Sequence, residues 1–118
     1  MNELDKKLAE WLYPKAKITV KDCGYAGRKI LIWYGEYPPR GKHDIDGWFT
    51  DSLDLCFEWL VPKLLSRNYY VEIIQGEVDD ATCHLHTNLE KPEFITYAKT
   101  PAPALCLAIE KLIDKEGK

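Results

Sequence analysis

The chain has 118 residues, of which 46% are hydrophobic and 30% are charged, and its 16 basic and 19 acidic side chains give a net charge of -3. This length and composition predict one domain over residues 1–118, with an apolar core that needs no disulfide or metal ion to hold it. The slightly acidic balance argues against a dedicated nucleic-acid-binding protein, because such proteins usually carry a clustered basic face.

The sequence also predicts a cytoplasmic protein. No stretch approaches the roughly 18–20 consecutive apolar residues that cross a bilayer, and the first seven residues lack the apolar core of a signal peptide. The four cysteines are widely scattered and show no CxxC spacing. We therefore expect reduced thiols, with Cys56 and Cys106 packed on apolar helix faces as small hydrophobic residues.

The first half of the chain predicts a helix, two strands and a long loop. Residues 2–12 carry apolar side chains at helical spacing with acidic residues in the first turn, and Pro14 ends this helix. Residues 17–21 alternate like a short edge strand, and residues 29–34 form a strand that is apolar on both faces and should need cover on both. Residues 35–48 contain two prolines and three glycines and predict an irregular loop.

The next helix is predicted to begin after Thr50, which is a good N-cap, and to keep an apolar face as far as Leu64. Pro62 lies inside this helix, where it removes one hydrogen bond and clashes with the carbonyl of Glu58. We expect a kink there, or an early end followed by a short turn.

The second half predicts three short strands and a final helix. Residues 69–75 and 81–87 form an antiparallel hairpin, in which Thr82, His84 and His86 point away from the core, and a further strand covers 94–98. The last helix follows Thr100 as cap and has Pro101 at its first position. The order of elements predicts an α+β fold, an α-β-α sandwich whose small, mostly antiparallel sheet is covered by about three helices.

Two helix entries are similar to those of a known family. One is Phe-Thr-Asp-Ser-Leu at residues 49–53, and the other is Thr-Pro-Ala-Pro-Ala-Leu-Cys-Leu-Ala at residues 100–108. With the predicted N-terminal helix ahead of them, they resemble small bacteriophage and prophage proteins that carry the phage α-β-α (ABA) sandwich domain. The resemblance covers most of the chain and implies that fold and a viral or prophage gene. It implies no activity, because the group has no established function to carry over.

His84 and His86 form the first candidate for chemistry. Residues two apart on a strand project from the same face, about 6.5–7 Å apart along it, so two imidazoles can share one zinc ion. A metal site needs further ligands, and His43, Asp44 and Glu72 are candidates that the spacing alone cannot rank. The alternative is that the two histidines are polar residues on a partly solvated face.

Nucleophilic chemistry is not indicated. Cys83 and His84 are neighbours on a strand and face opposite ways, so they cannot form a Cys–His pair. The glycines at 24 and 27 lack the Lys-Ser/Thr element of a phosphate-binding loop. The sequence therefore predicts a protein that is not an enzyme and has no cofactor.

The predicted loop gathers aromatic and basic residues of the kinds that dominate protein interfaces and stack on bases. Trp33, Trp48 and Phe49 have an alternative role, which is to anchor the loop to the core. The candidate binding residues are Tyr37, Arg40, Lys42, His43 and Trp48.

The function predicted on these grounds is that of a non-enzymatic phage or prophage accessory protein that binds a protein partner or its own copies. Two alternatives stay open. One is a protein that sequesters a small anionic, nucleotide-like ligand through the aromatic and basic loop. The other is a metal-dependent hydrolase built on His84 and His86.

Overall fold

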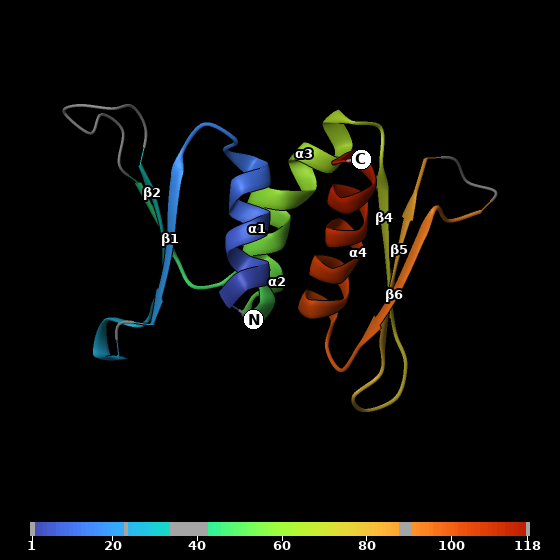
Figure 1. Ribbon diagram of the computed structural model, residues 1–118. Coiled ribbons are helices and arrows are strands. Elements are labelled where there is room, and N and C mark those ends of the chain that lie inside the picture. Colours follow the sequence, from blue (N-terminus) through green and yellow to red (C-terminus); the bar gives the residue numbers. More distant parts are fainter. Residues whose placement is uncertain (1, 23, 34–42, 88–90, 118) are drawn as a thin grey trace.

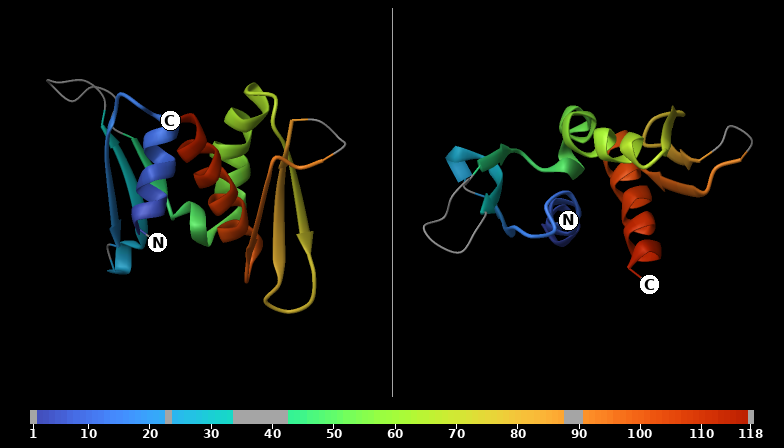
Figure 2. Two further views of the ribbon diagram at one scale, coloured as in Figure 1. Left: turned by 45° about the vertical axis from the view of Figure 1, so that its right-hand side comes forward. Right: turned by 90° about the horizontal axis from the view of Figure 1, so that it is seen from above.

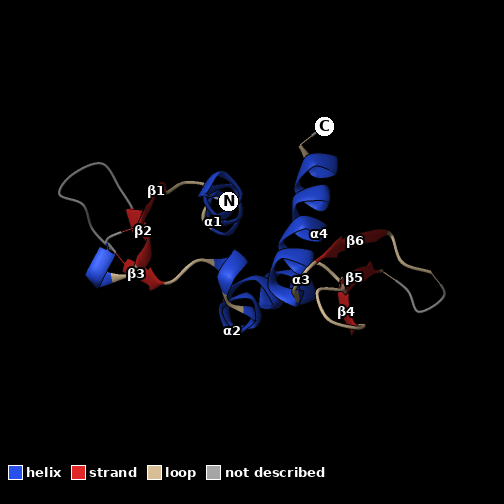
Figure 3. Ribbon diagram, turned by 90° about the horizontal axis from the view of Figure 1, so that it is seen from below, coloured by secondary structure: helices blue, strands red, loops and turns tan. Residues whose placement is uncertain are grey.

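The computed structural model describes residues 2–22, 24–33, 43–87 and 91–117, and it has the predicted α+β fold (Figure 1). Within these described residues, six strands form two separate three-stranded antiparallel sheets. The sheets lie at opposite ends of the molecule and the helices lie between them, an order of layers that is also visible in Figures 2 and 3. The α+β class and the antiparallel pairing are thus confirmed.

The first sheet packs against the N-terminal helix, α1 (Asn2–Leu12). Ile30 and Ile32 face this helix and are fully buried, whereas Leu31 and Trp33 on the opposite face are only partly buried. The helices therefore cover one face of this sheet and leave the other partly exposed, although cover on both faces was predicted. The strands of this sheet are β1 (Lys17–Asp22), β2 (Arg28–Trp33) and β3 (His43–Asp46), and the short 3-10 turn η1 (Gly24–Ala26) joins the first two.

Strand β3 corrects the prediction of an irregular loop over residues 35–48. It pairs with β2 in register, with Ile45 opposite Ile30. Ile45 is the only apolar side chain in this strand, so the segment offers too little alternation for a strand to be recognised from its sequence. Pairing with the strongly apolar β2 is what makes it a strand.

A chain of short helical turns follows. Its first α-helical turn begins two residues later than predicted, because the N-cap is Ser52 rather than Thr50. The Ser52 Oγ accepts a hydrogen bond of 3.2 Å from the Leu55 N–H. The successive turns are η2 (Phe49–Asp51), α2 (Leu53–Leu55), η3 (Cys56–Leu60) and α3 (Val61–Ser66).

Element η3 is a π-helical turn, which interrupts the α-helical hydrogen bonding just before Pro62. The Val61 N–H donates to the Cys56 carbonyl, five residues back, and α3 then begins afresh. Pro62 consequently lies in the first turn of α3, where a backbone N–H has no helical partner to lose. The predicted interruption of the helix at Pro62 is confirmed. The helix is interrupted by a widened, π-helical turn.

The second sheet packs against the C-terminal helix, α4 (Pro101–Glu116). Cys83 and Leu85 point toward this helix and are fully buried, while His84 and His86 on the same strand point away, as predicted. Thr100 occupies the N-cap position of α4, and its side chain makes no capping hydrogen bond. The strands are β4 (Tyr70–Gln75), β5 (Ala81–His86) and β6 (Phe94–Ala98).

The helices form the central layer because α4 is buried on more than one side. It contacts the second sheet and also α1, to which it is joined by the ion pairs of Lys7 with Glu110 and Asp114, at 3.4 and 2.6 Å. Ala104 and Ala108, one turn apart, are fully buried and widen the packing surface. The sequence predicted a single sheet covered by helices, whereas the structure has two sheets with the helices between them (Figure 1). No helix in the described part of the chain has both the length and the apolar character needed to cross a membrane.

The thiols of Cys56, Cys83 and Cys106 should resist modification in the folded protein. All three are buried and unbridged, and burial raises the pKa of Cys83 to about 12. The hydrogen bond with Cys56, whose Sγ lies 3.8 Å away, and burial raise the pKa of Cys106 as well. Because thiolates are the reactive form, a Cys23→Ser variant should react with a disulfide reagent such as DTNB only after denaturant is added. Rapid reaction of the native variant would contradict this packing.

Candidate metal centre

The hairpin between β4 and β5 places Glu72 directly opposite His84. The register is set at the connecting turn, where the Gly76 N–H donates to the Asp80 carbonyl over 2.8 Å. Side chains alternate between the two faces of a strand, so Glu72, His84 and His86 all project from the outer face of the second sheet.

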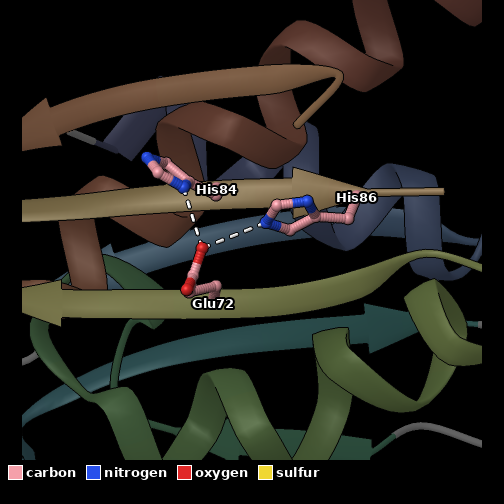
Figure 4. Close-up of side chains that lie close together, drawn as sticks. All are labelled: Glu72, His84 and His86. Atoms are coloured by element: carbon pink, nitrogen blue, oxygen red, sulfur yellow. Dashed lines mark hydrogen bonds and ion pairs between the residues drawn. The ribbon is translucent and has the colours of Figure 1, made fainter. Parts of the chain in front are cut away.

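The three side chains converge on one point (Figure 4). The Glu72 Oε1 lies 2.9 Å from His84 Nδ1 and 3.1 Å from His86 Nε2. One ligand atom from each residue lies within 4.8 Å of the other two, and among the described residues no other three His, Cys, Asp or Glu side chains come so close together. We call this group the Glu72–His84–His86 triad.

The triad fits a divalent transition-metal ion. Zinc binds His nitrogen and carboxylate oxygen at about 2.0–2.2 Å, which places adjacent ligand atoms of one shell roughly 3 Å apart. The two contacts of the Glu72 oxygen have this spacing. Two imidazoles and one carboxylate are a donor set found at catalytic zinc and non-haem iron centres, where further coordination positions stay open.

Without an ion, the same atoms form a hydrogen-bonded cluster. His86 and His84 donate to the Glu72 carboxylate, and these hydrogen bonds lower the pKa of Glu72 below its ordinary value. The Glu72 side chain is 52% exposed, whereas those of His84 and His86 are 20% and 14% exposed. The imidazoles are therefore held by packing, while an ion can approach past the carboxylate.

The surroundings of His86 limit the expected strength of metal binding. Its Nδ1 atom is buried and has no hydrogen-bond partner among the described residues. Metal-bound histidines almost always donate their second ring N–H to an acceptor, and loss of that partner typically lowers metal affinity about 10–100-fold. We therefore expect weaker binding than at a centre in which both imidazoles have such an acceptor.

Of the ligand candidates named from the sequence, the structure brings Glu72 to the histidine pair. Asp44 is exposed in β3, which belongs to the other sheet at the far end of the molecule (Figure 1). His43 begins the same strand, and its side chain lies outside the described part of the structure. The two sheets separate both residues from the triad.

The candidate binding residues of the predicted aromatic and basic loop lie only partly within the described residues. Tyr37, Arg40 and Lys42 lie outside the described residues. Trp48 is 7% exposed, and the Arg28 guanidinium lies 4.7 Å from the centre of its ring. Trp48 thus belongs to the core, as does the fully buried Phe49.

Exposed apolar residues surround the triad, and they were not among the residues predicted from the sequence to form a site. Tyr70 lies opposite His86, and Ile95 on β6 lies opposite His84. A cavity of about 250 Å³ adjoins the triad on the Tyr70 side, and Tyr70, Val71, Glu72 and His86 line it. The strands at 69–75 and 94–98 carry apolar residues on both faces, and this was the sequence signal for an apolar surface on the outer side. The exposed apolar residues of this outer sheet face are Tyr70, Ile74, Ile95 and Tyr97.

Comparison with known proteins adds no relative. No protein-family model, curated protein or solved structure matches the chain. The resemblance to phage α-β-α sandwich proteins therefore stays a prediction, and a function has to be inferred from the site itself.

Proposed function

We propose that this protein binds one divalent transition-metal ion through the Glu72–His84–His86 triad, and Zn²⁺ is the leading candidate. The observation that carries the proposal is the pair of 2.9 and 3.1 Å contacts from one Glu72 oxygen to nitrogens of two imidazoles. Three protein ligands leave at least one coordination position for water or another ligand, as in catalytic rather than structural zinc sites.

Binding is better supported than turnover. A hydrolytic zinc site needs a general base close to the metal-bound water. Among the described residues that line the neighbouring cavity, the ionisable groups are the Tyr70 phenol and the two ligands Glu72 and His86. We therefore propose a metal-binding accessory protein without catalytic turnover, and its origin in a phage or prophage rests on the resemblance alone.

Isothermal titration of metal-free protein without a histidine tag tests this proposal. We expect one Zn²⁺ per chain. Removing a group that hydrogen-bonds a metal ligand typically lowers metal affinity roughly 10–100-fold. His84→Ala removes a ligand itself, so it should lower the affinity by more than that. His43→Ala is the matched control, since it removes a histidine from the other sheet and should leave the affinity unchanged. Absence of stoichiometric binding, or equal losses in both variants, would refute the proposed site.

A further inference from the structure

The open side of the triad adjoins the cavity described above. Two of the four lining residues, Glu72 and His86, are also metal ligands, and Tyr70 lies directly opposite His86 in the strand register. The Tyr70 side chain is 53% exposed, so its ring is available to a bound molecule. A ligand atom at an open coordination position would therefore have an aromatic ring beside it.

The charge of the loaded site favours an anion. A Zn²⁺ ion with one carboxylate and two neutral imidazoles leaves a single positive charge on the outer face of the sheet. One monoanionic ligand with an oxygen donor neutralises that charge and fills the open position. Neutral ligands of the same shape lack this attraction.

The size and lining of the cavity indicate what kind of group the oxygen donor of the ligand is attached to. Its volume of about 250 Å³ is below the roughly 300–1,000 Å³ of sites for drug-sized ligands, so it suits a molecule with a single ring. The ring of Tyr70 offers apolar surface at the cavity, and aromatic pairs gain more than their buried area alone provides.

We propose that the metal-loaded site binds a small aromatic monoanion, such as an aryl carboxylate or aryl hydroxamate. Its oxygen atoms bind the ion and its ring packs against Tyr70. This inference rests on the proposed metal-binding function and names the class of ligand that completes the same site.

Titration of the Zn²⁺-loaded protein with benzohydroxamate and acetohydroxamate tests the inference. Both compounds bind zinc as monoanions, and only the first carries a ring. We expect benzohydroxamate to bind about three- to tenfold more tightly, the range that an aromatic pair contributes. Tyr70→Ala should abolish this preference and Tyr70→Phe should keep it. Tyr97→Ala is the matched control, because Tyr97 is exposed on the same face but lies opposite Thr82, away from the cavity.

The outcomes separate the two proposals. If Zn²⁺ does not bind, the proposed function fails. If Zn²⁺ binds but the ring preference is absent, or survives in Tyr70→Ala, the inference about the ligand is overturned while the metal site stands. The inference is also overturned if benzohydroxamate binds metal-free protein as tightly as Zn²⁺-loaded protein. It is likewise overturned if the hydroxamate removes the ion from the protein, and the metal content after gel filtration measures such a loss.

Discussion

Zinc at 100 times its dissociation constant should raise the free energy of unfolding by about 2.7 kcal/mol. For a chain of this length, that gain corresponds to a rise of roughly 10 °C in the midpoint of thermal unfolding. The reason is that Glu72 lies on β4 and the two histidines lie on β5, so only the folded hairpin brings the three ligands together. Differential scanning calorimetry with and without Zn²⁺ measures the shift.

The charge of Glu72 should carry much of this stabilisation. Glu72→Gln removes the negative charge, so we expect the zinc-dependent shift to fall to a small fraction of its original size. Glu77→Gln is the matched control, because Glu77 is an exposed residue of the turn between the same two strands. Equal shifts in the two variants would show that zinc acts elsewhere on the protein.

Asp5→Ala should lower the free energy of unfolding by about 2–4 kcal/mol. This range is expected because the substitution leaves buried polar groups unpaired and creates a small cavity. Asp5 is fully buried, and its carboxylate accepts hydrogen bonds from the Thr50 N–H at 3.1 Å and the Thr50 hydroxyl at 2.9 Å. The substitution leaves both donors without this acceptor. Urea unfolding followed by circular dichroism gives the difference.

The control for this prediction is Glu10→Ala, at an exposed acidic position of the same helix, which should change stability by less than about 0.5 kcal/mol. Similar losses in the two variants would mean that the Asp5–Thr50 contact contributes little. A loss confined to Asp5→Ala would establish that this contact joins α1 to the turn at η2.

Stability should also depend on pH through Asp5. Burial raises the pKa of its carboxyl above the ordinary value of 3.8, and the hydrogen bonds from Thr50 offset part of the rise. The folded protein then holds the proton more tightly than the unfolded chain, so this group reduces stability as the pH rises above 3.8. Asp5→Asn removes the charge and keeps an oxygen acceptor. Relative to the wild type, the variant should therefore gain stability as the pH rises from 3.8 to the raised pKa of Asp5, and the gain should then level off.

The histidine pair could be predicted from the sequence, but Glu72 could be named only as one of three candidates for its third ligand. Alternation along β5 is regular, so His84 and His86 were expected to share an outward face, as they do. The partner of His84 depends on the register of the hairpin, and a shift of one residue would turn Glu72 to the core side. That register is fixed by hydrogen bonds at the turn, such as that from the Gly76 N–H to the Asp80 carbonyl.

Asp5 and Thr50 show why contacts distant in the sequence were missed. The sequence assigned Asp5 to the helix dipole and Thr50 to a helix cap, which are both local roles. In the structure they bond to each other across 45 positions, and a nearby serine takes the capping role. Local patterns describe each element separately, whereas this contact arises only when α1 packs against the turn at η2.

Each sheet is built from one continuous stretch of chain, residues 17–46 for the first and 70–98 for the second. Strands that neighbour one another in the sheets are also neighbours in sequence, so each pairing closes a short loop at a small loss of chain entropy. The ion pair of Lys7 with Glu110 instead joins residues 103 positions apart. During folding, we therefore expect the two sheets to form early as separate units, and the docking of α1 against α4 to be the late event that joins them.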